Sequence, residues 1–438
     1  MHICGGGGGI LVYITDTGMD QGVDNNTISE VQAEFVTHIS DSKYHLNDKN
    51  LYVLPTNMTS DDLNEMLCNL LSINKVKFAF YCYGMQLYST IAELLEQIDF
   101  KCESTLTITY SLLDYSKEQI IDELNCWVSC MDYLHNLNQL IISSAEGMIW
   151  TIDNDNGQRV LGRKITDGEI ASFDTKTYNK CTYLAIISSY GHIEIAEISD
   201  VKSSYNSISH FKAHLNSGTG IKFSPNFNVL ATSGYDRAIR IFSINNIQDF
   251  CKPNESKKRN STDFYNILEE KDIYWGHSDA ITAINYTKND VIKTVSFDNT
   301  YRLWDVTSSK CKNTINLSKS ASCLDTNVND LSAIGHINGL VSIYDDKGEA
   351  CIFGGKLHSR IVSDVKWSSF YEHIFATSSN DGMIVVSDLR FNKSPIFTWK
   401  CDRSEEFIRA CCWINDNNLA TGSNKGEVTR HVINNLSI

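Results

Sequence analysis

The chain has 438 residues, of which 42% are hydrophobic and 21% are charged, and its formal net charge is −15. These values are typical of a soluble globular protein, and the length indicates two domains. The acidic balance argues against general nucleic-acid binding, because phosphate contacts need Lys and Arg. No apolar run approaches the roughly 18 residues that span a bilayer, so we expect no membrane partner.

The first residues predict no secondary structure. The range 1–30 is rich in Gly, Asp and Asn, and we expect it to be a disordered leader. It contains a glycine run from Gly5 to Gly9, but no Lys-Ser/Thr pair follows, so the run is not a phosphate loop. It has no basic region of the kind that opens a signal peptide.

The range 31–111 predicts a small domain. Its strands are expected over 31–37, 51–54, 77–81 and 104–110. The run Thr59-Ser60-Asp61-Asp62 is expected to supply the N-cap and the first acids of a helix whose apolar face begins at Leu63, Met66 and Leu67. A short helix is expected over 91–98. This order of strands and helices is typical of a ubiquitin-like β-grasp.

The range 112–438 contains a repeat. A tight turn after a short β-run recurs at Glu146, Gly191, Asp236, Asp298, Asn338, Asp381 and Lys425. Apart from the step between Asp236 and Asp298, the spacing is about 40–45 residues, the length of a four-stranded propeller blade. An alternating strand follows the turn, as in Tyr301–Trp304. We therefore expect a mainly β protein with a seven-bladed propeller.

The repeat count has two consequences. The outer strand of the last blade must come from elsewhere, because a ring with an open edge would leave unpaired backbone, and we expect 118–124 to supply it. The long step contains an insertion at 248–271, with Lys257, Lys258 and Arg259 in it. We expect a surface loop whose basic residues are either a nuclear import signal or simply solvated.

The fourth repeat unit carries the clearest motif. Gly276-His277 opens it, Asp298 follows, and Trp304-Asp305 closes it. This pattern resembles the WD repeat, which implies a hydrogen-bonded chain through the blade formed by His277, Ser296 (or Thr294), Asp298 and Trp304. The pairs His214 with Asp236 and His358 with Asp381 have similar separations. Because such pairs recur once per blade, they indicate structure rather than catalysis, and we expect no enzyme.

Fourteen cysteines are scattered along the chain, several of them within apolar strand patterns. This usage favours free buried thiols in a reducing compartment. Cys126 and Cys130 lie four residues apart, but no second pair or nearby His completes a zinc site. We expect neither a resident metal, nor another cofactor, nor a small-molecule substrate.

The order of the domains resembles the Ytm family of ribosome-biogenesis WD-repeat proteins. The likeness covers about 400 residues and rests on the segments that begin at Gln32, Asn125, Ile273 and Ser363, together with the basic loop. WD motifs specify only the fold, so the domain order and the loop carry the family assignment. The chain departs from the family in its glycine-rich start and in its few Trp-Asp pairs, which weakens the alignment in the first two blades.

The resemblance implies a non-catalytic assembly factor for the large (60S) ribosomal subunit that acts in rRNA processing in the nucleolus and nucleoplasm. Its implied partners are a pescadillo-type protein, a Bop/Erb-type WD-repeat protein, the pre-60S particle and the AAA ATPase midasin, which removes it. The resemblance also implies that midasin binds the ubiquitin-like domain, with Glu103 completing a divalent-metal site, expected to hold Mg²⁺, in trans. Without the resemblance, Glu103 would count as an ordinary turn acid.

Two other functional classes compete with this one. A substrate receptor of a cullin ubiquitin ligase can carry Trp-Asp-x-Arg after a blade, and Ser387-Asp388-Leu389-Arg390 is a degraded form of that motif. An enzyme with a propeller active site would need a nucleophile motif, a metal constellation or a phosphate loop, and the sequence offers none.

Overall fold

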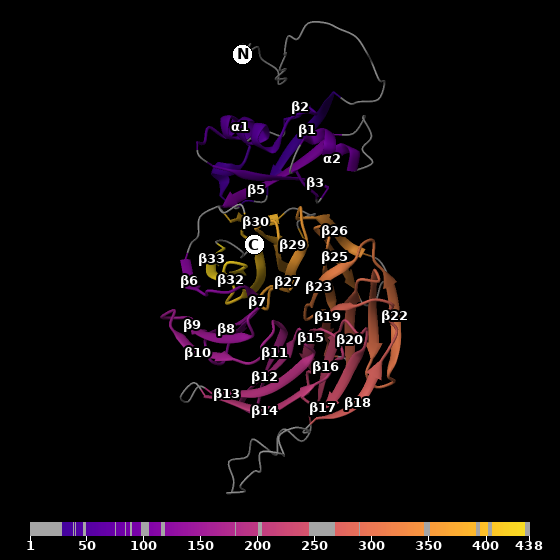
Figure 1. Cartoon of the computed structure of the whole chain (residues 1–438). Coiled ribbons are helices and arrows are strands. Elements are labelled where there is room, and N and C mark those ends of the chain that lie inside the picture. Colours follow the sequence, from indigo (N-terminus) through magenta and orange to yellow (C-terminus); the bar gives the residue numbers. More distant parts are fainter. Residues whose placement is uncertain are drawn as a thin grey trace, which may run out of the picture.

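The computed structural model describes residues 29–433 except 38, 40, 47–49, 75, 84, 88–89, 98–104, 115–118, 180, 200–203, 245–267, 289, 346–350, 391–394 and 402–404. The expected leader, the core of the basic insertion and Glu103 therefore lie outside the described residues, apart from the start of β1. The described part contains an N-terminal domain beside a ring of β-sheets (Figure 1).

The N-terminal domain is built on one mixed sheet. Its elements are β1 (Glu30–Thr37), the 3-10 helix η1 (Ser42–Tyr44), β2 (Tyr52–Pro55), α1 (Ser60–Leu71), β3 (Phe78–Cys82), β4 (Met85–Gln86), α2 (Ile91–Gln97) and β5 (Leu106–Asp114). The strand order is β2-β1-β5-β3-β4, and the central pair β1 and β5 is parallel. This is the order of a β-grasp, as the sequence predicted.

Helix α1 begins where the sequence predicted. The Thr59 hydroxyl accepts from the Asp62 backbone N–H at 3.3 Å, and the Asp62 carboxylate accepts from the Thr59 backbone N–H at 2.8 Å. This reciprocal capping box satisfies two N–H groups that have no partner within the helix. The apolar face of α1 buries Leu63 and Leu67 in a core shared with β1, β3 and β5.

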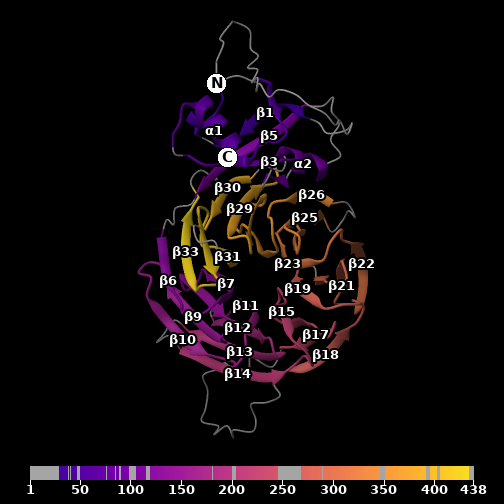
Figure 2. The same ribbon diagram turned by 45° about the horizontal axis from the view of Figure 1, so that its top comes forward.

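The ring has seven blades in the described part of the chain, each with four antiparallel strands, of which one lies near the central axis and the last lies at the outside (Figure 2). Blades 1 to 3 contain β7 (Val128–Leu134), β8 (Gln139–Ser144), β9 (Met148–Asp153), β10 (Arg159–Lys164); β11 (Ile170–Tyr178), β12 (Cys181–Ser188), β13 (His192–Ser199), β14 (Ser204–Lys212); β15 (Gly218–Phe223), β16 (Val229–Gly234), β17 (Ile239–Ser243) and β18 (Glu269–Tyr274).

Blades 4 to 6 contain β19 (Ile281–Tyr286), β20 (Val291–Ser296), β21 (Thr300–Asp305), β22 (Lys310–Asn316); β23 (Ala321–Thr326), β24 (Leu331–His336), β25 (Leu340–Asp345), β26 (Cys351–Lys356); β27 (Val362–Trp367), β28 (Ile374–Ser379), β29 (Met383–Asp388) and β30 (Pro395–Lys400). Blade 7 contains β31 (Ile408–Trp413), β32 (Asn418–Ser423), β33 (Glu427–Val432) and β6 (Gln119–Glu123). Strand β18 begins inside the range 248–271, so the insertion ends earlier than the sequence suggested.

The ring closes through β6. This strand pairs antiparallel with β33, so a segment from the start of the propeller completes its last blade. Packing closes the same seam, because Val128 and Met131 of blade 1 share a core with Ala410 and Val428 of blade 7. The prediction that 118–124 supplies the missing strand is confirmed.

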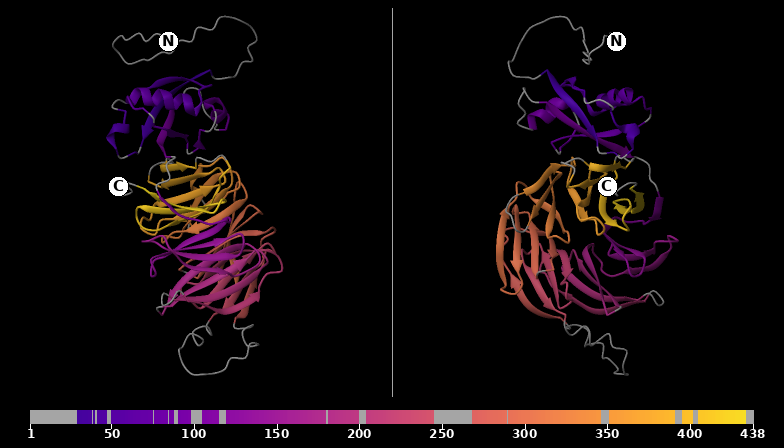
Figure 3. Two further views of the ribbon diagram at one scale, coloured as in Figure 1. Left: turned by 60° about the vertical axis from the view of Figure 1, so that its left-hand side comes forward. Right: turned by 180° about the vertical axis from the view of Figure 1, so that it is seen from behind.

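The N-terminal domain is joined to blade 6. Strand β5 runs beyond the expected boundary at residue 111, and its last residues pair in parallel with β30, Leu113 with Thr398 and Asp114 with Trp399. The N-terminal sheet and blade 6 thus form one sheet of nine strands. The side view shows the domain beside this part of the ring (Figure 3).

A buried hydroxyl cluster reinforces the junction. The Tyr81 and Thr398 hydroxyl oxygens lie 2.9 Å apart, and those of Ser111 and Thr398 lie 3.3 Å apart. Burial raises the pKa of Tyr81 well above its ordinary value, so the phenol stays protonated and can donate. A cavity of about 260 Å³ lies beside this contact, and Lys77 and Lys400 line it from opposite sides.

Candidate protein-binding face of the propeller

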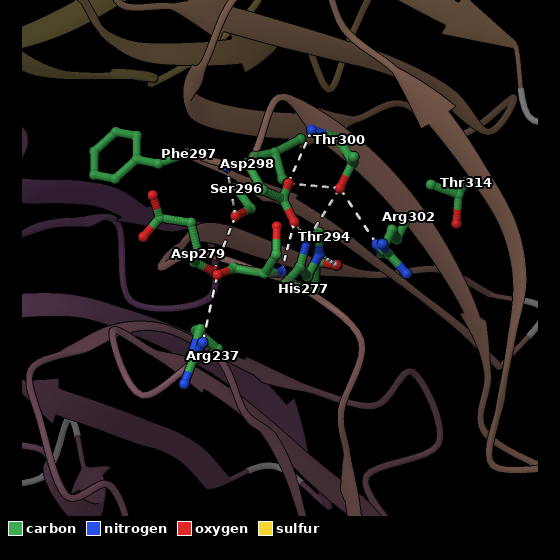
Figure 4. Close-up of polar contacts among 12 residues, drawn as sticks. Arg237, His277, Asp279, Thr294, Ser296, Phe297, Asp298, Thr300, Arg302 and Thr314 are labelled. Atoms are coloured by element: carbon green, nitrogen blue, oxygen red, sulfur yellow. Dashed lines mark hydrogen bonds and ion pairs between the residues drawn. The ribbon is translucent and has the colours of Figure 1, made fainter.

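The fourth blade contains a buried polar chain beneath one face of the ring (Figure 4). The His277 Nδ1 lies 2.9 Å from Asp298, and its Nε2 lies 2.8 Å from the Thr294 hydroxyl, to which Trp304 Nε1 donates at 2.9 Å. Because Trp only donates, the Thr294 hydrogen is available to His277 Nε2. The Nδ1–H of a neutral imidazole then donates to Asp298.

The protonation states of this chain follow from its surroundings. Burial lowers the pKa of His277, and its contact with Asp298 offsets only part of that shift. Burial opposes ionisation of Asp298, but hydrogen bonds from Thr300 and His277 outweigh it and lower the pKa of the carboxyl. The stable state is therefore a neutral imidazole beside a carboxylate.

The sequence favoured Ser296 over Thr294 as the hydroxyl that links His277 to Trp304. In the structure that hydroxyl belongs to Thr294. Ser296 lies at the end of β20, where its hydroxyl donates to the backbone oxygen of Ala280 at 2.8 Å and accepts from the Asp298 N–H at 3.1 Å. Thr294 lies two residues earlier, within reach of both His277 and Trp304. Ser296 thus fixes the turn, whereas Thr294 connects the rings.

The other two predicted pairs also form. His214 contacts Asp236 at 2.8 Å and the Thr232 hydroxyl at 2.9 Å. His358 contacts Asp381 at 3.2 Å and the Thr377 hydroxyl at 2.8 Å. In both blades the threonine occupies the position of Thr294, a role that strand alternation could have suggested.

Each carboxylate also fixes the backbone of the loop that enters its blade. Ser278 N–H donates to Asp298 at 2.9 Å, and Ser359 N–H donates to Asp381 at 2.9 Å. The turn between the second and third strands of a blade is thereby tied to the loop from the preceding blade. Because both lie at the same end of the strands, the buried pairs hold one face of the propeller rigid.

That face presents large apolar side chains to solvent. Among the described residues, the exposed members in these turns and loops are Trp127, Tyr190, Leu215, Tyr235, Trp275, Phe297, Ile337 and Ile361, which we call the apolar face. Leu215, next to His214, is 79% exposed. Phe297 points away from the polar chain beneath it (Figure 4). Their recurrence at equivalent positions on one face makes this face the candidate interaction surface of the ring.

Neighbouring members of the apolar face support one another. The rings of Tyr235 and Phe297 lie edge to face at 6.4 Å. The Arg409 guanidinium lies 6.0 Å from the Trp127 ring and pairs with Glu169 at 3.3 Å. Aromatic and Arg side chains of this kind are the usual anchors of protein interfaces. This surface was not predicted from the sequence, although the aromatic residue before Asp236 and Asp298 was a visible signal.

Glu103 lies outside the described residues, but Leu106, the first residue of β5, is at the end of the strand away from the junction at Leu113. In the described ranges, no group of three or more His, Cys, Asp or Glu side chains could hold a metal. No helix there is long and apolar enough to cross a membrane.

Comparison with known proteins agrees with this architecture. Residues 31–95 match the NLE (NUC135) domain, and residues 205–243 match the WD domain, G-beta repeat. The "Ribosome biogenesis protein WDR12 homolog" of Anopheles gambiae is 23% identical over 93% of this chain and 96% of its own length. The "Ribosome biogenesis protein YTM1" of Saccharomyces cerevisiae is 23% identical over 84% and 89%. These matches support the Ytm/WDR12 family of WD-repeat ribosome-biogenesis proteins as the family that this chain resembles.

Proposed function

We propose that the chain is a non-catalytic assembly factor for the large (60S) ribosomal subunit that supports rRNA processing and pre-60S maturation. The apolar face is the observation that supports this role best, because exposed side chains on a rigid ring suit extended contacts with proteins. The names of the full-length relatives supply the process. The proposed partners are a pescadillo-type protein and a Bop/Erb-type WD-repeat protein.

The apolar face can be tested by co-purification from cells. A chain carrying Tyr235→Ala with Phe297→Ala should lose these two partners, since truncating central aromatic anchors often costs about 2 kcal/mol or more each. Ile352→Ala is a matched control, because Ile352 is 55% exposed on β26, outside the turns and loops of the apolar face. Retention of both partners by the double variant would assign their binding to another surface.

The N-terminal domain is the proposed binding site for midasin, which would remove the protein from the particle. A carboxylate oxygen suits a hard divalent cation such as Mg²⁺, and Glu103 is proposed to supply it to a metal held by the ATPase. The start of β5 at Leu106 supports this role, because the junction with blade 6 occupies the opposite end of the strand. The continuous sheet would carry a pull on this domain into the propeller.

Glu103→Gln tests the proposed binding of midasin to the N-terminal domain. The change keeps the size and removes the charge, so it should leave folding intact and abolish pull-down of the metal-binding domain of midasin. Glu65→Gln is the control, because Glu65 is an exposed acid on α1 of the same domain. Pull-down that survives Glu103→Gln would sink the assignment.

The proposed role implies a cellular location, and a cullin substrate receptor is the alternative to that role. An assembly factor of this kind is proposed to reside in the nucleolus and nucleoplasm. For a cullin substrate receptor, the relevant motif would be Asp388-x-Arg390, but the Arg390 guanidinium pairs with the buried Asp388 carboxylate at 2.6 Å. No further observation favours that alternative, and co-purification of a cullin adaptor would be its signature.

A further inference from the structure

A cavity of about 530 Å³ lies at the rim of the propeller between blades 1 and 2. Lys164, at the end of β10, lines it from blade 1, and Asp167 lines it from the following loop. Tyr190, His192 and His210 line it from blade 2. The volume is within the range of small-molecule and cofactor sites. Tyr190 is also a member of the apolar face, but neither that face nor the blade networks account for the charged and imidazole side chains of Lys164, His192 and His210.

The two histidines form a stacked pair. His192 on β13 and His210 on β14 have ring centroids 5.6 Å apart and planes 13° from parallel. Lys212 is the register partner of His192, so it adds a cation on the same face of the sheet. Burial, together with His210 and Lys212, lowers the pKa of His192. A bound anion would relieve this crowding of cationic groups.

The acidic groups nearby leave the site cationic. Asp167 pairs with Lys164 at 3.3 Å but is 96% exposed, so solvent screens this contact. Glu194, the register partner of His210, is buried and accepts from the Tyr205 hydroxyl at 2.9 Å. The Arg163 guanidinium lies 4.6 Å from the Tyr205 ring and adds positive charge beside it. This local balance is the reverse of the chain's net charge of −15.

An aromatic ring stands at the mouth of the cavity. Tyr190 is 58% exposed, and its ring packs against Gly168. A Cβ atom at Gly168 would lie 2.5 Å from Tyr190 Cε2, so the absence of a side chain there allows the ring its position. Tyr190 thus lines the cavity together with two imidazoles and Lys164, and Lys212 lies next to His192 on the neighbouring strand.

We propose that this cavity binds a nucleotide of single-stranded RNA, with the base stacked on Tyr190 and the phosphate held by Lys164, Lys212 and the paired imidazoles. Tyrosine and histidine rings are common stacking partners of unpaired bases, and lysines beside them neutralise the backbone. The choice of RNA over another phosphate ligand rests on the proposed role in ribosome assembly. The cavity therefore gives an acidic protein one local contact with rRNA.

Fluorescence anisotropy of the purified full chain with a short labelled oligouridine tests the proposal. Tyr190→Ala should weaken binding at least about fivefold through lost stacking. Lys212→Ala should weaken it as well and reduce the slope of affinity against salt by about one. The double variant Lys310→Ala, Lys312→Ala is the matched control, because these exposed lysines lie on β22, the outer strand of blade 4.

The imidazole pair gives a second readout. An anion favours the protonated rings, so affinity should rise as the pH falls from about 8 to about 6. Replacing His192 and His210 together by Gln should flatten this pH profile, whereas the Lys310/Lys312 control should keep it. Unchanged melting temperatures would show that the variants remain folded.

The outcomes of this binding assay distinguish the RNA-binding proposal from the proposed role in ribosome assembly. RNA binding that is absent from the wild type, or unaffected in all pocket variants, overturns it. Tight binding of a phosphoserine peptide without binding of RNA also overturns it, because the pocket would then serve a protein ligand. The purified assay contains no midasin or pescadillo-type protein, so its result does not depend on the Glu103 and co-purification experiments.

Discussion

The N-terminal domain and the propeller are held together by different means. The domain has a single core around α1 and one mixed sheet, and its described contacts with the ring are the short β5–β30 pairing with the side chains beside it and an approach of β4 to β26. The propeller distributes its core over all seven blades and closes on itself through β6. A narrow junction beside a closed ring suits a domain that another protein grips while the ring holds its own partners.

The largest test of this contrast is Trp304→Ala. Trp304 is buried, stacks on Tyr274 with centroids 5.9 Å apart, and donates to Thr294. Its truncation should lower the free energy of unfolding of the propeller by about 3–5 kcal/mol. Hydrogen exchange during urea unfolding should show lost protection in the blades and unchanged protection in β1 and β3.

Trp275→Ala is the control for this change, because Trp275 is 59% exposed. Its effect on unfolding should stay within about 0.5 kcal/mol. If Trp304→Ala weakened the N-terminal domain as much as the blades, the two regions would be one cooperative unit and the contrast would fail.

A smaller difference in stability between the propeller and the N-terminal domain is expected when the pH is lowered. Burial lowers the pKa of His277 and His336 below the ordinary value of about 6.5, so the folded propeller binds fewer protons than the unfolded chain. Stability is therefore complete above about pH 6.5 and falls towards the folded pKa by up to about 1.4 kcal/mol per pH unit for each proton. The depressed pKa of Asp298 adds a loss below about pH 3.8.

The N-terminal domain should not share the first of these losses. The one histidine among its described residues, His45, is exposed and lies outside its core. Urea midpoints between about pH 7 and pH 5 would therefore fall for the blades alone. His277→Asn should make the slope shallower and His135→Asn, at an exposed position, should not. Equal slopes in the two regions would contradict the assignment.

The smallest expected effect concerns the junction. Thr398→Val removes the hydroxyl that contacts Tyr81 and Ser111, at a cost of about 0.5–1.5 kcal/mol, because Tyr81 retains Ser111 as a partner. A lysine cross-linker should join Lys77 and Lys400 across their shared cavity less often in this variant. Thr398→Ser keeps the hydroxyl and should cross-link like the wild type; a loss there would point to packing rather than hydrogen bonding.

Several elements could be read directly from the sequence because their determinants are local. Thr59 and Asp62 lie three residues apart and cap α1 without help from the rest of the chain. The turn at Asp298 recurs in other blades because every blade is the same four-stranded unit, which buries its apolar faces against its neighbours. The need for a closing strand followed from counting blades, and β6 lies where that count placed it.

Other features needed distances through space. Ser296 and Thr294 are equally plausible hydroxyls in the sequence, and only the positions of the His277 and Trp304 rings selected Thr294. The apolar face was missed because exposure depends on which end of each strand a turn occupies. The pairing of β5 with β30 joins segments nearly the whole propeller apart in sequence, which no local pattern encodes.

The sequence by itself determined a seven-bladed WD-repeat ring, a β-grasp domain before it and the buried His–Asp pairs, because repeat spacing and strand alternation depend on neighbouring residues. Only the tertiary structure decided that one face is rigid and apolar, that a cationic cavity lies between blades 1 and 2, and that the first domain extends the sheet of blade 6. These features arise where distant segments meet, so their chemistry exists only once the ring has closed.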